Sequence, residues 1–524
     1  MDIRQVISEN PDLQRLLFVR GFLLTDNVNI DTADFPFCGS WKTVDFENGY
    51  YAVLHNLTGF TKIVRNNKIF FLFGHAYNPF TMEYKEETIL EHIADNFGKD
   101  SFQDSIDELT GIFLFGYFNG DSLRFISDPS GKQSSCCGII DNHFYLASHA
   151  QLIGDICDLK MTDFVKELVS YRWYSRVMGA YLPADLTPYS EVKRIVPNIL
   201  YSYSGNKISH KRFYPLKDID VCYDEADYQS VIEQGADILK NSMALIPKKW
   251  SAPAISLTGG IDSNTTFAAA NGNYDKFTAF SYCSAEKETI DCEAAQKIAN
   301  AFNVPWKLYA IPDTNDNLDR FYEKVAIIVH NNGYIDRAPE NELRKRIYLE
   351  ENFEGADVEV KSWASEIIRA YWNKYYGKKN LPGLSAKSFR NYYKLFFTNR
   401  ILAHKVDRVF EKYIIDYEYD KIPLMYPPAD MHCWEVTESS KCGMDISEMK
   451  MYSDITIIYN NRKFFDLMFK VPFEKRLSDQ HHLDMKKYLN KELYDMNSRV
   501  KNMKETQFRA NMFNLEFTVN SILP

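Results

Sequence analysis

An apolar strand that runs through two glycines into a helix constrains the fold of this chain more than any other segment. Residues 253–260, PAISLTGG, have the pattern of a buried strand, and residues 262–272, DSNTTFAAANG, that of a helix with a glycine stop. The next three segments, KFTAFSYC, CEAAQKIANAFN and VPWKLYAIP, read as strand, helix and strand. Strands that alternate with helices predict a parallel sheet with right-handed crossovers.

The first part of the chain has a different pattern. From residue 16 to about 150, short apolar runs are separated by turn residues such as NN, NGD and DN, which are hairpin signals. The one helix expected there is about Glu86–Asn96. A helical stretch over Lys160–Ser175 and a hairpin around Gly205 and Asn206 follow. This part is therefore predicted to be mostly antiparallel β.

These patterns predict two domains and a mixed fold class, α/β plus α+β. Residues 1–218 form an antiparallel β-rich domain. Residues 219–524 form a parallel-sheet domain whose C-terminal part, from about residue 315, is mainly helical.

Composition excludes several function classes. The chain has 524 residues, a net charge of -10 and a hydrophobic fraction of 45%, so we expect no nucleic-acid partner. Its first residues lack a signal pattern and no apolar run approaches the roughly 20 residues of a membrane helix, so we expect no membrane association and a cytoplasmic location. Nine cysteines show neither a disulfide framework nor CxxC spacing.

The glycine turn has the chemistry of a phosphate site. Glycines let backbone N–H groups approach a ligand, and the following helix N-terminus adds donors and a favourable dipole. The turn lacks the lysine of a GxxxxGK[ST] loop and the three spaced glycines of the dinucleotide fingerprint.

The segment from Thr258 to Ser263 instead resembles the SGGxDS pyrophosphate loop of the ATP-pyrophosphatase superfamily. The resemblance implies that ATP and Mg²⁺ bind here, with Asp262 as a metal ligand. It implies an ATP-binding set that consists of Leu257, Thr258, Gly259, Gly260, Asp262 and Ser263.

Two further segments resemble the asparagine synthetase family. FTAFSY followed by EKETIDCEAAQKIANAF is similar to that family's adenine-binding strand, which implies adenine contacts at Ser281 and Tyr282. KSWASEIIRAYW is similar to the family's GEGSDELFGGY segment. That alignment implies that Glu366 is a metal ligand and a catalytic residue. The same alignment puts Ser365 and Ser362 where the family has acids.

The upstream part resembles the glutaminase half of asparagine synthetases, in LFGHAYNP and in the segment from Asp107 to Ile153. The resemblance implies an Ntn-type sandwich for residues 1–218. A working glutaminase of this type needs a cysteine at residue 2, whose free α-amine serves as the base. Residue 2 is Asp, so we expect a degenerate domain that hydrolyses no glutamine.

Together the resemblances imply an AMP-forming carbon–nitrogen ligase, similar to β-lactam synthetases and lasso-peptide cyclases. It would adenylate a small-molecule or peptide carboxylate and transfer the acyl group to an amine or to ammonia. Residues that could take the amine's proton are Lys361, which we expect to be catalytic, and Tyr371, Lys374 and the lysines near 470–487.

Other interpretations stay open. One is an asparagine synthetase that uses ammonia. Another is a noncatalytic nucleotide-binding or scaffold protein, favoured by Ser362 and Ser365. A sulfur- or RNA-handling ATP-pyrophosphatase ranks last. The oligomeric state also stays open, with a homodimer as one candidate. His481 and His482 do not converge on a metal, because neighbours on a helix point about 100° apart, and we expect them at the surface.

Overall fold

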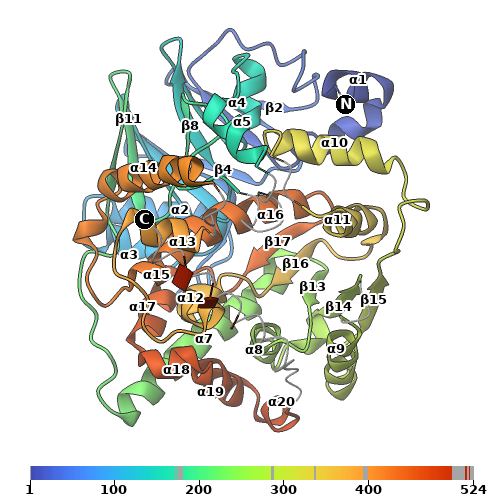
Figure 1. Cartoon of the computed structure of the whole chain (residues 1–524), viewed down its shortest axis with the longest axis vertical. Helices are drawn as coiled ribbons and strands as arrows, with labels where there is room; N and C mark the ends of the chain where they lie inside the picture. The colour runs from blue at the N-terminus through green and yellow to red at the C-terminus, as the bar shows by residue number, and fades with distance from the viewer. Residues whose placement is uncertain are drawn as a thin grey trace.

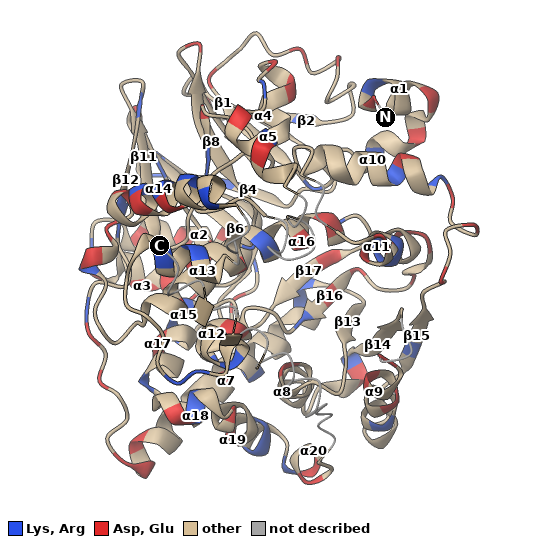
Figure 2. Ribbon diagram, in the orientation of Figure 1, with Lys and Arg blue, Asp and Glu red and all other residues tan. Residues whose placement is uncertain are grey.

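The computed structural model describes residues 2–171, 174, 181–284, 288–335, 338–393 and 399–497, and residues 511, 514, 515, 518 and 519 of the C-terminal tail. The predicted helical stretch over 160–175 and the segment EKETIDCEAAQKIANAF each lie partly outside these residues. Within the described part, no helix has the length and apolar character needed to span a membrane. Acidic and basic side chains are interspersed along the ribbon (Figure 2).

Two antiparallel sheets of six strands each form the first part of the molecule (Figure 1). In spatial order, the strands of one sheet are β10 (Val192–Arg194), β8 (Cys136–Ile140), β9 (His143–Ala147), β1 (Phe22–Thr25), β3 (Tyr51–Leu54) and β2 (Lys42–Asp45). Those of the other are β12 (Lys207–Arg212), β11 (Ile199–Ser204), β7 (Ser122–Ser127), β6 (Thr110–Asn119), β5 (Lys68–Tyr77) and β4 (Phe60–Arg65). The predicted antiparallel pattern and the hairpin at Gly205 and Asn206 are confirmed.

The two sheets pack face to face through aromatic side chains. Phe22 of β1 stacks on Phe73 of β5 with ring centroids 4.1 Å apart and ring planes almost parallel. Phe46 and Phe71 join the same buried cluster with edge-on contacts. Inward-facing residues of both sheets therefore form one core, as in a β-sandwich.

Short helices flank the sandwich. The predicted helix at Glu86–Asn96 is confirmed as α2, but the expectation that it stands alone was wrong, because α3 (Ser101–Asp107) follows it. The two turns of α3 are too short to show a clear helical period, and tertiary packing of Phe102 and Ile106 stabilises them. The other helices of this part are α1 (Ile3–Glu9), η1 (Pro11–Leu16), α4 (Ala150–Ile156) and α5 (Asp163–Val169).

A parallel sheet of five strands lies at the centre of the second part. Its order is β15 (Trp306–Ala310), β14 (Thr278–Cys283), β13 (Pro253–Ser256), β16 (Val358–Lys361) and β17 (Asp454–Ile457). The three strands predicted from the alternating pattern are confirmed. Strands β16 and β17 come from the region expected to be mainly helical, and each has only four residues.

Helices cover this sheet and form most of the C-terminal part. The helices that precede β16 in the chain are α7 (Glu225–Lys249), α8 (Ile261–Ala269), η2 (Tyr274–Lys276), α9 (Thr289–Ala301), α10 (Phe321–Asn331) and α11 (Glu340–Asn352). After β16 come η4 (Ser365–Ile368), α12 (Tyr371–Tyr376), α13 (Ala386–Tyr392), α14 (Arg400–Asp416), η5 (Tyr419–Lys421), α15 (Pro428–His432), η6 (Cys433–Cys442) and α16 (Gly443–Met449). After β17 come α17 (Arg462–Lys470), α18 (Phe473–Leu477), α19 (Gln480–Leu489) and α20 (Lys491–Asp495).

Buried polar contacts join the two parts. The Tyr77 and Thr456 hydroxyls lie 3.0 Å apart, and Arg212 forms a fully buried ion pair with Glu435 at 2.7 Å. The segment between β12 and α7 contains the predicted boundary at 218/219, which stays a prediction.

Candidate functional site

The turn from β13 to α8 lies at the carboxyl edge of the parallel sheet, where ligands bind in open α/β folds. Its first residue is fixed on the sheet, because the Leu257 N–H donates to the Phe280 carbonyl at 2.9 Å and the Ser281 hydroxyl donates to the Leu257 carbonyl at 2.7 Å. Trp306 Nε1 donates in turn to Ser281 Oγ at 3.1 Å. The buried Ser281 side chain therefore positions the turn, and its predicted adenine contact stays a prediction.

The polar groups of the turn bind one another. Ser263 Oγ lies 3.0 Å from Thr258 Oγ1 and accepts a hydrogen bond from the Thr258 N–H at 3.0 Å. The Gly260 N–H donates to Thr258 Oγ1 at 3.1 Å. Asn264, which the sequence did not single out, donates from Nδ2 to the carbonyls of Thr258 and Gly260 at 2.9 and 2.8 Å. The turn is thus held in shape by its own side chains.

A carboxylate from the next helix also contacts the turn. Asp291 of α9 accepts a hydrogen bond from the Gly259 backbone, and burial raises the pKa of this acid while that hydrogen bond opposes the shift. Sequence reasoning missed Asp291, because a single acid in an amphipathic helix usually faces solvent.

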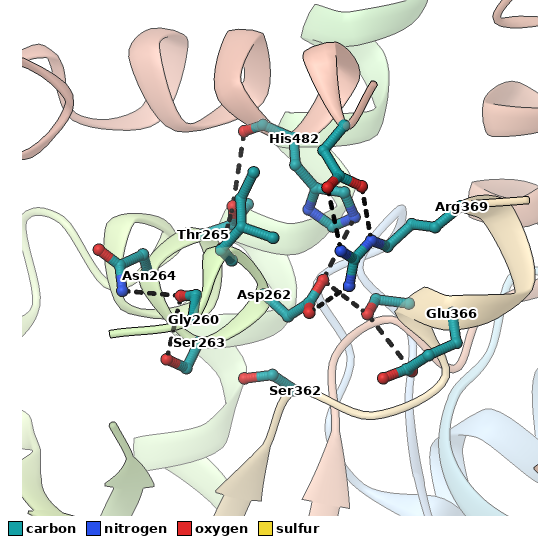
Figure 3. A network of polar contacts seen from close by, with 12 residues as sticks. Gly260, Asp262, Ser263, Asn264, Thr265, Ser362, Glu366, Arg369 and His482 are labelled. Carbon is teal, nitrogen blue, oxygen red and sulfur yellow. Dashed lines mark hydrogen bonds and ion pairs between the residues drawn. The ribbon is translucent and has the colours of Figure 1, made fainter. Parts of the chain in front are cut away.

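Asp262 in the first turn of α8 is the centre of the polar network in Figure 3. The Ser365 hydroxyl donates to its Oδ1 at 2.8 Å, and Arg369 forms an ion pair with its Oδ2. His482 Nε2 lies 3.6 Å from Oδ1. The Tyr459 hydroxyl donates to the Asp262 carbonyl at 3.0 Å. Four segments that are distant in the sequence therefore meet at this residue.

A second acid shares the cations of this network. Asp479 accepts hydrogen bonds from Arg369 Nε at 2.8 Å and Nη2 at 3.2 Å, and it is ion-paired with Lys374. Burial acts to raise the pKa of Asp479, but the two cations outweigh it and hold that pKa well below its usual range. Burial and the neighbouring Arg369 lower the pKa of Lys374 to about 8.

Glu366 lies on the other side of Ser365, whose hydroxyl is 3.5 Å from Glu366 Oε2. Burial, with the nearby charges of Glu438 and Asp262, raises the pKa of Glu366 to about 8. Glu366 also lines a pocket of about 220 Å³, together with Trp363, Tyr371, Trp372, Tyr181 and Glu438. The pocket thus combines aromatic walls with carboxylates.

Asp262 and Glu366 are both within hydrogen-bonding reach of one hydroxyl, so two carboxyl groups face the same region, and oxygen ligands of this kind suit Mg²⁺ once Glu366 has lost its proton. Among the described residues, no group of three or more His, Cys, Asp and Glu side chains is arranged to hold a metal ion. Mg²⁺ commonly uses one or two carboxylates and completes its shell with phosphate oxygens and water. The donor set therefore fits a magnesium ion that arrives with a nucleotide.

The remaining predicted residues lie around this centre. The Ser362 hydroxyl is 2.8 Å from Thr266 Oγ1 of α8. Lys361, at the end of β16, is buried and paired with Glu359 at 2.7 Å, and its ammonium is 5.9 Å from the centroid of the Tyr282 ring. The predicted catalytic role of Lys361 and the adenine contact of Tyr282 stay predictions.

The expectation that His481 and His482 lie at the surface was wrong. Both side chains are fully buried, because α19 packs against α7 and α8 instead of facing solvent. The His482 carbonyl accepts a hydrogen bond from Thr265 Oγ1 at 3.5 Å (Figure 3). His482 thereby becomes part of the surroundings of Asp262.

Sequence reasoning also missed Arg369 and Asp479. Arg369 is three residues after Glu366, in the segment that carries the family resemblance, and this position on the same helical turn was the available signal. No sequence pattern marked Asp479, because its contact with Arg369 joins residues that are 110 positions apart in the chain.

Comparisons with known proteins give no family. No family model and no curated protein matches the chain. A solved structure of glutamine phosphoribosylpyrophosphate (PRPP) amidotransferase from B. subtilis, complexed with ADP and GMP, is 12% identical over 71% of this chain and 74% of its own, with a TM-score of 0.22. A structure described as the allosteric regulatory enzyme of purine biosynthesis is 10% identical over 57% of this chain and 77% of its own, with a TM-score of 0.23. Similarities with such low TM-scores carry no argument about this protein.

Proposed function

We propose that the protein is an ATP-dependent ligase that activates a substrate carboxylate as an acyl-adenylate and transfers the acyl group to an amine or to ammonia. The observation that carries the proposal is the meeting of Asp262, Glu366, Arg369 and Lys374 beside a glycine turn at the carboxyl edge of a parallel sheet. Two carboxylates and the Arg369 guanidinium next to backbone donors suit a bound Mg²⁺–triphosphate.

In this proposal the turn receives the β- and γ-phosphates. Thr258 and Ser263 supply hydroxyl donors, and Gly259 and Gly260 supply backbone N–H groups. Asp262 and Glu366 would hold Mg²⁺, which neutralises charge on the leaving pyrophosphate. Arg369 would exchange its contact with Asp262 for a phosphate oxygen, because a guanidinium binds either anion with the same geometry.

The pocket beside Glu366 is the proposed place for the organic substrates. An oxygen of the bound carboxylate forms a bond to the α-phosphorus, and the bond from that phosphorus to pyrophosphate breaks. The amine nitrogen then forms a bond to the acyl carbon, and AMP leaves with the bonding electrons. The amine must lose a proton, and Lys374, with its pKa of about 8, is suited to accept it once the pH passes that value.

We further propose that the sandwich of residues 1–218 is a glutaminase-like domain that hydrolyses no glutamine. Its segment at residues 76–79, AYNP, lacks the NGE triplet of the glutaminases that it resembles. The ligase would therefore take its nitrogen from a substrate amine or from free ammonia. An ammonia-dependent asparagine synthetase would catalyse the same kind of reaction on a small substrate.

One observation favours a second candidate, a noncatalytic nucleotide-binding protein. Arg369 is paired with Asp262, and the N–H groups of Gly259 and Gly260 are already bonded to Asp291 and Thr258. A turn that is satisfied in this way could bind a nucleotide weakly without organising it for reaction.

The test incubates the purified full chain with MgATP and a cell extract of small metabolites, with and without glutamine, and measures AMP and pyrophosphate. Asp262→Asn is the test variant. Asp275→Asn is the matched control, because Asp275 is exposed and pairs only with its neighbour Lys276. Binding of MgATP is measured separately by calorimetry in the absence of extract.

The ligase is supported if the wild type and the control release AMP and pyrophosphate in equal amounts, with or without glutamine, and if Asp262→Asn releases neither. Binding of MgATP without either product favours the noncatalytic candidate. Absence of both binding and products overturns the assignment of the turn to ATP.

A further inference from the structure

A second polar cavity lies between the β-sandwich and the parallel-sheet domain. Its volume is about 430 Å³, within the range of about 300–1,000 Å³ that small-ligand pockets occupy. The charged and titratable side chains that line it are Arg20, His75, Glu86, Lys249, Lys450 and Asp454. Residues from both parts of the chain therefore build it.

The cavity is distinct from the nucleotide turn. Asp454 is the first residue of β17, whereas the turn lies at the carboxyl edge of the sheet, beyond Ile457 at the other end of that strand. The three steps from Asp454 to Ile457, at about 3.3 Å each, separate the two edges by about 10 Å. A ligand in this cavity would not occupy the phosphate site.

The charges in the cavity do not balance. Lys249 is neutralised by an ion pair with Glu86. Arg20 and Lys450, in contrast, face one unpaired carboxylate of the lining, that of Asp454. Burial lowers the pKa of Lys450 to about 8, against the opposing effect of Asp454 and of Asp128 outside the lining, so its ammonium is mostly charged at pH 7. Lys450 Nζ donates to the neutral Gln133 side chain at 2.8 Å and not to an acid. One positive charge is thus in excess among the described lining residues.

Two buried nitrogen atoms there have no hydrogen-bond partner. They are Nε2 of His75 and Nε of Arg20. The His75 side chain is held by the edge of the Trp250 ring, with centroids 4.8 Å apart, and its Nδ1 is 3.7 Å from Asp454. Burial lowers the pKa of His75 to about 3, so the ring is neutral. Buried polar groups left without a partner are costly, and such groups in a cavity indicate a place for a polar ligand.

The backbone gives the cavity a fixed wall. Gly59 and Gly74 line it, and the Gly74 N–H donates to the Gly59 carbonyl at 2.8 Å. A Cβ atom on Gly74 would lie 2.1 Å from the Ile112 carbonyl oxygen, and one on Gly59 would lie 2.5 Å from the Gly74 carbonyl oxygen. No larger residue fits at either position, because the backbone of the adjoining segment is in the way.

We propose that this cavity binds a small organic monoanion, with its carboxylate held between Arg20 and Lys450. The carboxylate would neutralise the excess charge and give Arg20 Nε an acceptor. A donor group on the ligand, a hydroxyl or an ammonium, would pair with the neutral His75 ring. Asp454 disfavours dianions, because a second negative charge would face it at close range. The proposal does not depend on the proposed ligase activity.

The experiment measures the melting temperature of the nucleotide-free protein at pH 7 with increasing acetate, L-lactate, succinate or inorganic phosphate, against sodium chloride at equal ionic strength. The variants are Arg20→Gln, Lys450→Gln and Asp454→Asn. Arg65→Gln is the control, because Arg65 is an exposed cation on the adjoining strand β4. Arg20 is partly exposed, so Arg20→Gln is expected to fold even if Lys450→Gln does not.

We expect a saturable rise in melting temperature with lactate or acetate in the wild type and in Arg65→Gln, weakened at least tenfold in Arg20→Gln and Lys450→Gln. Asp454→Asn should bind succinate at least tenfold more tightly than the wild type does, an increase that a merely damaged fold would not produce. The proposal is overturned if neither monoanion exceeds sodium chloride, if Arg20→Gln responds like the wild type, or if phosphate alone binds.

Discussion

Asp479 offers the sharpest test of the network around the turn. Its side chain is 8% exposed and accepts three hydrogen bonds, two from Arg369 and one from Lys374. Removing one partner of a buried ion pair costs about 3–5 kcal/mol, because the other charge is left unpaired. Asn keeps one oxygen acceptor and tolerates the left-handed backbone at this position, where φ is 64°. We therefore expect Asp479→Asn to lower the free energy of unfolding by about 3 kcal/mol.

Urea unfolding at pH 7 measures this difference, with Asp495→Asn as the control. Asp495 is exposed and pairs only with Lys491 on the same helix, so its replacement should change stability by less than about 0.5 kcal/mol. Because the pKa of Asp479 is lowered in the folded protein, its stabilisation is complete above the unfolded pKa of about 3.9. The difference between wild type and variant should be constant from pH 7 to 5 and shrink below about pH 4. A loss of less than about 1 kcal/mol at pH 7 would refute this account of the network.

Three further results are expected. Asp262→Asn should reduce formation of AMP and pyrophosphate at least 100-fold, about 2.7 kcal/mol in the barrier, while Asp275→Asn leaves it unchanged in the same product assay. The rate of amide formation should rise as the pH passes about 8, where Lys374 loses its proton, and Lys374→Arg should remove this rise in a pH–rate profile. Arg212→Met should cost about 3–5 kcal/mol in urea unfolding because Glu435 is left buried and unpaired, and adding Glu435→Met should restore most of the loss.

The parts of the fold that the sequence predicted are those with a clear local pattern. Strand β13, its glycine turn and helix α8 follow one another directly in the sequence, so local periodicity was enough to predict them. Strands β16 and β17 were hidden because each is short and lies among helices. In β16, VEVK, the two charged residues suggest an exposed face, yet Glu359 and Lys361 are buried and neutralise each other. Only the tertiary structure supplies that pairing.

The residues of the candidate site also fall into two groups, those that a local sequence pattern predicted and those that it did not. Asp262 and Ser263 were predicted because the turn holds them at fixed spacing. Arg369 and Asp479 reach Asp262 through contacts over more than 100 residues, which no local pattern records. His482 was misjudged because its helix carries charged neighbours, while its own side chain faces α8.

The hydrogen bonds inside the turn determine what a nucleotide would have to do there. The Gly260 N–H is bonded to Thr258, and the Gly259 N–H to Asp291, so phosphate oxygens could gain these donors only by displacing both side chains. The bond from Gly260 to the neutral Thr258 hydroxyl is worth about 1 kcal/mol net, and a bond from the same donor to a charged phosphate about twice that. The bond from Gly259 to the Asp291 carboxylate is already charge-assisted, so its exchange for a phosphate is close to neutral. The two exchanges together therefore favour a phosphate and disfavour an uncharged ligand, which would replace the charged acceptor of Gly259 by a weaker one. Asp291 adds to this selection, because its carboxylate must move away or be protonated when the phosphates arrive, and burial already raises its pKa in that direction.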